Sequence, residues 1–110
     1  MLQVHFLDSR GIRKTIAARG GTTLMEVAVQ NGVEGIDAEC GGACACATCH
    51  VYVDGAWIDR VGPPGTTEHE LLDAIGERRR PESRLSCQIK VVEALDGLVV
   101  TTPAEQGPPT

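Results

Sequence analysis

The sequence predicts a single α+β domain, and three patterns along the chain support this fold class. Alternating apolar residues at Leu2, Val4 and Phe6, and again over residues 12–16, predict two strands joined by a turn. A helical pattern follows the glycine pair at residues 20–21. Further strand and helix patterns continue to about residue 102. The 110 residues, 42% of them hydrophobic, suffice for one compact core.

The first predicted helix has clear signals at both ends. Residues 23–26 read TLME, the pattern of a capping box in which Thr23 and Glu26 satisfy each other's backbone donors. Asn31-Gly32 then predicts a left-handed stop. Residues 50–53 predict a short strand, and residues 55–65 are expected to be irregular because of Gly62-Pro63-Pro64-Gly65.

The second predicted helix begins at a capping box formed by Thr67 and Glu70 and runs to about Glu77. Its helical spacing separates an apolar face from an acidic face. The apolar face contains Leu71, Leu72 and Ile75, and the acidic face contains Glu70, Asp73 and Glu77. Residues 87–91 and 98–100 predict two more strands. The tail, residues 103–110, has nothing to bury, so we expect a folded domain over residues 1–102 and a flexible tail.

Residues 40–49 read CGGACACATC and contain four of the five cysteines. Glycine and alanine between the cysteines allow close approach of the backbone, and thiolates are soft ligands, so this segment indicates a metal-binding loop. The fifth cysteine, Cys87, lies in the apolar stretch 85–89. With Cys40, Cys46, Cys49 and Cys87 as ligands, three thiolates from one loop and one from a distant segment suit a [2Fe-2S] cluster.

Other kinds of cysteine site fit the spacing and the sequence context less well. Zinc sites usually pair two C-x2-C segments, whereas Cys46 and Cys49 form the single one here. A thiol redox pair needs a βαβ context, which is not evident around these cysteines. A Rieske centre needs two histidine ligands on one iron, whereas here four cysteines are available as ligands. Spacing alone also permits a cage of Cys40, Cys44, Cys46 and Cys49 without Cys87. We interpret Cys44 as a small apolar filler, with a spare ligand as the alternative.

The net charge of −5 is unevenly distributed, because residues 34–77 contain nine acidic residues and one basic residue, Arg60. Such a surface would repel nucleic acid, so we exclude that class of partner. It suits a basic protein partner, although acids that only aid solubility are the alternative. No apolar run is long enough to span a membrane, and the N-terminus has no pattern of an export signal. We therefore expect a cytoplasmic monomer with reduced thiols.

Two stretches carry a specific family resemblance. The cysteine loop followed by His50-Val51-Tyr52-Val53, and the segment SRLSCQI at residues 83–89, resemble the adrenodoxin and putidaredoxin family of [2Fe-2S] ferredoxins. The segment LDGLVV at residues 95–100 is similar to the closing hairpin of that family. The resemblance implies a β-grasp, ubiquitin-like fold and a structural hydrogen-bond bridge at His50. It implies the cluster ligands Cys40, Cys46, Cys49 and Cys87. The sequence departs from the family pattern at Cys44, where relatives usually carry a small residue that is not a ligand.

The resemblance also implies the function of a one-electron carrier rather than an enzyme. The implied donor is an NAD(P)H-dependent, FAD-containing ferredoxin reductase, and the implied acceptor is a cytochrome P450 monooxygenase. A role in iron-sulfur cluster assembly is the alternative. The acidic docking helix of the family maps onto residues 68–77, with Glu70 and Asp73 as the main contacts. The full set of expected docking residues is Glu39, Glu68, Glu70, Asp73 and Glu77.

Overall fold

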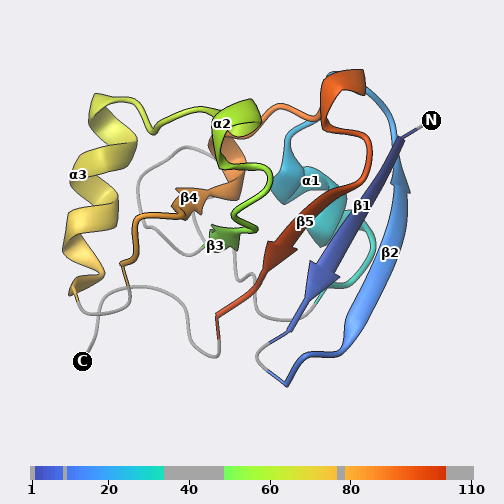
Figure 1. Ribbon diagram of the computed structural model, residues 1–110, viewed down its shortest axis with the longest axis horizontal. Coiled ribbons are helices and arrows are strands. Elements are labelled where there is room, and N and C mark those ends of the chain that lie inside the picture. The colour runs from blue at the N-terminus through green and yellow to red at the C-terminus, as the bar shows by residue number, and fades with distance from the viewer. Residues whose placement is uncertain (1, 9, 34–48, 77–78, 104–110) are drawn as a thin grey trace.

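The computed structural model describes residues 2–8, 10–33, 49–76 and 79–103. Within these ranges five strands form one mixed sheet in the order β2-β1-β5-β3-β4 (Figure 1). The strands are β1 (Leu2–Leu7), β2 (Arg13–Ala18), β3 (His50–Val53), β4 (Ser83–Leu85) and β5 (Leu98–Thr101). The helices are α1 (Leu24–Gln30), α2 (Ile58–Val61) and α3 (Thr66–Ala74), with the 3₁₀ turns η2 (Ser86–Gln88) and η3 (Glu93–Leu95).

The predicted N-terminal hairpin is confirmed. β1 and β2 pair antiparallel with Val4 opposite Ile16, so both side chains lie on the buried face of the sheet. Asp8 closes the turn, because its Oδ1 accepts hydrogen bonds from the backbone N–H groups of Arg10 (2.8 Å) and Ile12 (3.0 Å). These bonds lower the pKa of the Asp8 carboxyl, the bond from Ile12 most.

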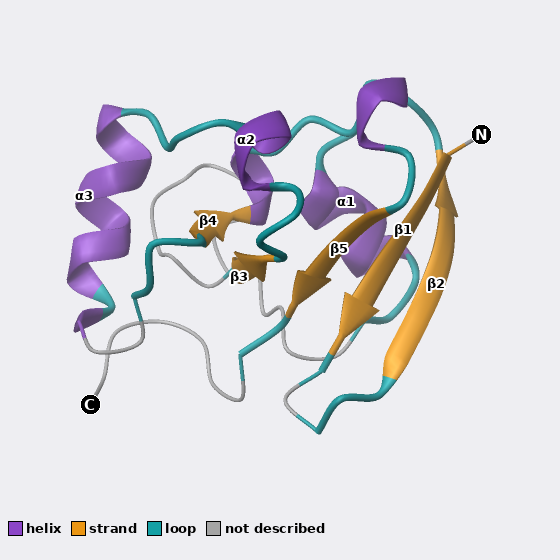
Figure 2. Ribbon diagram, in the orientation of Figure 1, coloured by secondary structure: helices purple, strands orange, loops and turns teal. Residues whose placement is uncertain are grey.

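The first helix, α1, begins as the sequence predicts. The hydroxyl of Thr23 accepts a hydrogen bond from the backbone N–H of Glu26 at 3.2 Å, and Gly32 beyond the helix adopts a positive φ of 65°. Leu24, Val27 and other apolar residues of α1 are buried against the sheet. In Figure 2 this helix lies behind β5 and β1, which is the arrangement of a β-grasp fold.

The last strand, β5, lies in the middle of the sheet. It pairs parallel with β1, with Val4 opposite Leu98, and antiparallel with β3, with Val53 opposite Val100. Leu98 and Val100 are completely buried. The hairpin at the N-terminus and the β3–β4 pair are therefore joined through a strand from the other end of the chain.

The prediction for the second long helix is wrong at its start. The helix α3 begins at Thr66 rather than after Thr67, and the residue at its N-cap is Gly65, which makes no side-chain hydrogen bond to the helix. The extended backbone of Gly65 (ψ 177°) follows Pro64, and its carbonyl accepts from the N–H of His69 at 2.8 Å. The helix can therefore form without the predicted capping box. It ends at Ala74, and Gly76 adopts a positive φ of 61°.

Two other segments differ from the predictions. Residues 58–61, expected to be irregular, form the short helix α2. Trp57, at the N-cap of this helix, is half-buried, and the guanidinium of Arg60 lies over its ring. Residues 87–91, expected to form a strand, begin inside the 3₁₀ turn η2 and contribute one isolated bridge, Thr23 to Lys90. In the described part of the chain, every helix is too short or too polar to serve as a membrane span. The predicted tail lies outside the described residues except for Pro103, which is buried.

Candidate metal centre

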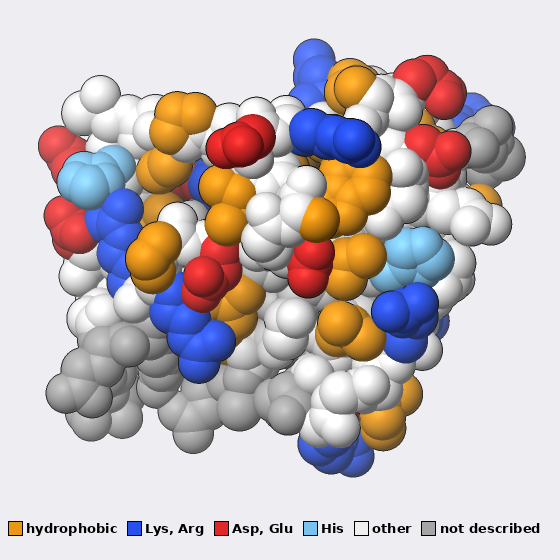
Figure 3. All heavy atoms as spheres, in the orientation of Figure 1, with side chains coloured by type: hydrophobic (Ala, Val, Ile, Leu, Met, Phe, Trp, Pro, Cys, Tyr) orange, Lys and Arg blue, Asp and Glu red, His pale blue; other side chains and the backbone are white. Residues whose placement is uncertain are grey.

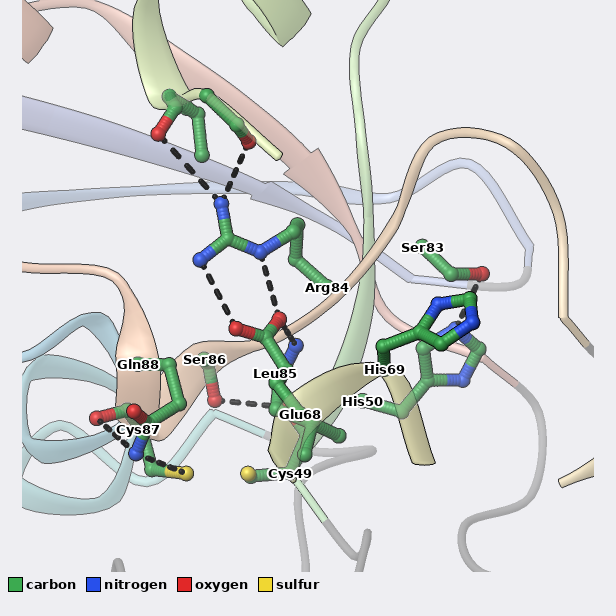
Figure 4. Close-up of polar contacts among 12 residues, drawn as sticks. Cys49, His50, Glu68, His69, Ser83, Arg84, Leu85, Ser86, Cys87 and Gln88 are labelled. Atoms are coloured by element: carbon green, nitrogen blue, oxygen red, sulfur yellow. Dashed lines mark hydrogen bonds and ion pairs between the residues drawn. The ribbon is translucent and has the colours of Figure 1, made fainter. Parts of the chain in front are cut away.

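Cys49 and Cys87 meet at one end of the β3–β4 pair. Cys49 precedes β3 and Cys87 follows β4, and His50 lies opposite Leu85 in the ladder. The next step of the ladder brings Ser86 to Cys49: the backbone N–H (2.9 Å) and hydroxyl (2.8 Å) of Ser86 both donate to the Cys49 carbonyl. Both cysteines are buried, and Figure 4 shows their sulfur atoms pointing toward each other. Two of the four predicted ligands are thus brought together from positions 38 residues apart in the chain.

The electrostatics of this pair suit a metal centre. The adjacent Cys87 thiol, and secondly burial, raise the pKa of the Cys49 thiol far above its ordinary value. Without a cation, two buried thiolates side by side would repel each other. The backbone N–H of Cys87 and the side chain of Ser86 act in the opposite direction and favour the thiolate. Soft sulfur donors, burial and donor groups aimed at sulfur therefore fit an iron-sulfur cluster, whose ferric ions supply the missing positive charge.

Three of the five cysteines, Cys40, Cys44 and Cys46, lie outside the described residues, as does Glu39. Within the described ranges, no group of three or more side chains with metal-binding atoms is present. The choice between the ligand set with Cys87 and the set with Cys44 in its place therefore stays a prediction. The proximity of Cys49 and Cys87 favours the set that includes Cys87.

His50 is a buried bridge between β3 and β4, the two strands next to the cysteines, as the resemblance implies. Its Nε2 forms a hydrogen bond of 2.8 Å with the Ser83 hydroxyl, which also accepts from the backbone N–H of Arg80. The imidazole contacts the Tyr52 ring edge to face, with the ring centroids 4.6 Å apart. The guanidinium of Arg80 lies over the Tyr52 ring, 4.4 Å from its centroid. His50 thereby fixes the orientation of β3 next to Cys49.

Glu68 is misplaced by the sequence prediction, because it does not belong to the exposed acidic face. It is 3% exposed, and its carboxylate accepts two hydrogen bonds from Arg84, at Nε (2.6 Å) and Nη2 (3.0 Å), in a bidentate ion pair (Figure 4). It also accepts from the N–H of Leu85 at 2.8 Å. The pair therefore attaches α3 to β4, two residues before Cys87.

A signal for this buried pair was present in the sequence. Glu68 precedes Leu72 by four residues and Ile75 by seven, so it falls on the apolar stripe of the helix. An acid on such a stripe requires a buried cation. Arg84, which lies in the buried strand β4, supplies it and also donates to the carbonyl of Gly62 at 2.7 Å.

Two of the predicted docking acids, Glu70 and Asp73, are exposed on α3 as expected, and Glu77 lies outside the described residues. Asp73 is already engaged within the chain, since its carboxylate forms an ion pair with Arg79. Arg79 also donates to Nδ1 (2.8 Å) and the carbonyl (3.3 Å) of His69. Figure 3 shows acidic, histidine and basic side chains next to one another at the α3 end of the molecule. Of the two described acids, Glu70 is the one without an ion pair among the described residues.

Comparison with known proteins gives a consistent result over nearly the whole chain. Residues 7–92 match the model of the 2Fe-2S iron-sulfur cluster binding domain. Ferredoxin CarAc from Sphingomonas sp is 51% identical over 96% of this chain and 95% of its own length. Putidaredoxin from Pseudomonas putida is 40% identical over 96% of this chain and 99% of its own length.

Solved structures agree with the β-grasp fold. Putidaredoxin in a covalent complex with putidaredoxin reductase is similar with a TM-score of 0.86 at 38% identity, covering 96% of this chain and 98% of that one. An ISC-like [2Fe-2S] ferredoxin from Pseudomonas putida JCM 20004 is similar with a TM-score of 0.80 at 27% identity, covering 100% and 99% of the two chains.

Proposed function

The chain belongs to the putidaredoxin-type family of [2Fe-2S] ferredoxins, which are electron-transfer proteins, and we propose that it carries electrons from an FAD-containing ferredoxin reductase to a cytochrome P450 monooxygenase. The observation that carries this proposal is the pair of buried sulfur atoms at Cys49 and Cys87, placed face to face at the end of the β3–β4 ladder. The proposed ligands are Cys40, Cys46, Cys49 and Cys87.

The bound cluster supplies a one-electron change of iron valence that needs neither a general base nor a bond to substrate. The role of the chain is to hold and orient this group. Ser86 fixes the Cys49 carbonyl with two hydrogen bonds, and the Glu68–Arg84 pair holds the strand that leads to Cys87. Because these groups are buried and satisfied, the site reorganises little when its charge changes.

The proposed donor docks on the exposed acids of α3, Glu70 and Asp73, together with Glu39 and Glu77. A relative at 38% identity has been captured in a covalent complex with its reductase, which supports a reductase as partner. A basic docking surface on that reductase would be attracted over a distance of about 8 Å at physiological salt. Such binding is weak and falls with rising salt, as a shuttle that exchanges partners requires.

The acceptor is proposed on the family resemblance. The alternative, a ferredoxin for iron-sulfur cluster assembly, has less support, because the ISC-like ferredoxin is 27% identical to this chain whereas CarAc is 51% and putidaredoxin 40% identical. We place the carrier in the cytoplasm as a monomer, where its thiols stay reduced until the cluster is loaded.

A reconstituted chain of electron transfer tests the proposal. The purified protein is first examined for the visible absorption of a [2Fe-2S] cluster and for one-electron reduction. NADH, a putidaredoxin-type reductase and a P450 are then added, and product is measured as salt is raised. Glu70→Gln is expected to raise the KM of the reductase for the ferredoxin about two- to fivefold. Glu93→Gln, on η3 at the other end of the molecule, is the matched control and should have no effect.

Separate results would contradict separate parts of the proposal. A colourless protein that takes up no iron would end the electron-carrier assignment. Efficient reduction by the reductase with no delivery to any P450, but with delivery to a cluster-assembly system, would favour the alternative role. Equal effects of Glu70→Gln and Glu93→Gln would remove α3 as the docking surface.

A further inference from the structure

The side-chain amide of Gln88 lies against the sulfur of a proposed cluster ligand. Its Nε2 is 3.6 Å from Sγ of Cys87 and 3.5 Å from the Cys87 carbonyl oxygen. Figure 4 marks both contacts with dashed lines. The carbonyl oxygen accepts hydrogen bonds and cannot donate one, and the same is true of the Cys87 sulfur once it is the thiolate of a cluster ligand, so the NH₂ end of the amide faces them. The side chain thus folds back over the residue that precedes it.

The backbone around Gln88 is held on both sides, which limits where this amide can go. Ser86, at the start of the turn η2, is fixed by its two hydrogen bonds to the Cys49 carbonyl. After the turn, the carbonyl of Ile89 accepts from the N–H of Leu24 at 2.8 Å, and the N–H of Ile89 donates to the Ser86 carbonyl at 3.3 Å. The turn is therefore anchored to both the cysteine pair and α1.

We propose that Gln88 sets the reduction potential of the cluster by donating a hydrogen bond from its side-chain amide to the sulfur of Cys87. This inference depends on the proposed function, since it takes Cys87 as a ligand. In the redox step one electron passes from the reductase flavin to the cluster, one ferric ion becomes ferrous, and no bond or proton is exchanged. The net charge of the cluster with its four thiolates changes from −2 to −3, because two ferric ions, two sulfides and four thiolates sum to −2.

The added negative charge is shared with the ligand sulfurs, so a donor aimed at one of them stabilises the reduced form more than the oxidised form. Gln88 is exposed, so its contribution is smaller than that of a buried donor. Loss of one such bond is expected to lower the ratio of reduced to oxidised protein, at a fixed applied potential, by about three- to tenfold. A tenfold change corresponds to about 59 mV for a one-electron couple.

The test is a potentiometric titration of the cluster-loaded protein and its variants. Gln88→Met keeps the length of the side chain and its neutrality but removes the donor, so its potential should be lower by the stated amount. Gln88→Glu replaces the donor by an acidic acceptor of the same shape and should lower the potential further. Gln30→Leu, on the exposed side of α1, removes an amide elsewhere and should leave the potential unchanged.

Visible circular dichroism and the electron paramagnetic resonance of the reduced form establish that each variant holds an intact cluster. Should Gln88→Met fail to load, Gln88→Leu takes its place. If loaded Gln88→Met or Gln88→Leu keeps the potential of the unchanged protein, the inference is overturned while the electron-carrier function stands. If the unchanged protein itself binds no cluster, the proposed function fails first. A shift in Gln30→Leu equal to that in Gln88→Met would also overturn the role of Gln88.

Discussion

Arg79 forms an ion pair with Asp73, an acid that the sequence predicts to contact a protein partner. We therefore expect Asp73→Asn to have different effects on partner binding in the presence and absence of Arg79. The guanidinium of Arg79 pairs with the carboxylate of Asp73 and donates to Nδ1 of His69. Because arginine has only donors, Nδ1 of His69 is the acceptor of this hydrogen bond. A basic group on the reductase therefore competes with Arg79 for the carboxylate of Asp73.

The magnitude follows from the exposure of the pair. The side chain of Asp73 is 63% exposed and that of Arg79 is 23% exposed. Exposed ion pairs contribute about 0.2–1 kcal/mol, and the two contacts of Arg79 to His69 favour the upper part of this range. A contribution of about 1 kcal/mol is roughly a fivefold change in Kd.

The perturbation is a double-mutant cycle of Asp73→Asn and Arg79→Gln, read out as the KM of the reductase for the ferredoxin at about 0.15 M salt, where distant charges are screened. Asp73→Asn is expected to weaken binding about three- to fivefold more in the Arg79→Gln background than in the unchanged protein. Arg80→Gln is the matched control, because Arg80 lies over Tyr52. This substitution removes the same charge without releasing Asp73. Equal effects of Asp73→Asn in both backgrounds, or the same coupling with Arg80→Gln, would refute the reasoning.

Three further expectations concern stability and the cluster. Glu68→Gln leaves a buried arginine without its counter-charge and should lower the free energy of unfolding by about 3–5 kcal/mol, measured by thermal denaturation. Glu70→Gln is the control, and similar losses of stability in the two variants would contradict the buried pair. Thr23→Ala removes the N-cap of α1 and should cost about 1 kcal/mol, whereas no loss in denaturant titrations would show that Thr23 is dispensable. Cys87→Ser should abolish the visible cluster bands while Cys44→Ser keeps them, and the reverse result would assign Cys44 as the ligand.

Local chemistry explains which parts of the fold could be predicted. The strands of the hairpin and the start of α1 depend on residues close in sequence: the alternation in residues 2–6, the turn at Asp8 and the cap at Thr23. The 3₁₀ turn at residues 86–88 could not be found in this way. There Ser86 donates to the carbonyl of Cys49, 37 residues earlier, and this long-range contact replaces the ladder that the alternating apolar and polar residues 87–91 suggest.

The site was predictable in its chemistry and less so in its surroundings. Thiolates at the observed spacing indicate a metal, and Cys49 and Cys87 do lie together. The docking acids required knowledge of neighbours, because a helical pattern does not reveal that Arg84 approaches Glu68 or that Arg79 folds back on Asp73. Each of these partners is more than five residues away in the chain, beyond the reach of helical periodicity.

The central position of β5 makes completion of the protein depend on its last strand. Until residues 98–101 are synthesised and inserted, β1 and β3 have no common neighbour, and the half that carries Cys49 and Cys87 is not tied to the N-terminal hairpin. A chain still emerging from the ribosome would expose two unpaired strand edges, which are sites for misassociation. Insertion of iron and sulfide is therefore expected to follow the insertion of β5, the long-range closure that joins the two parts of the sheet.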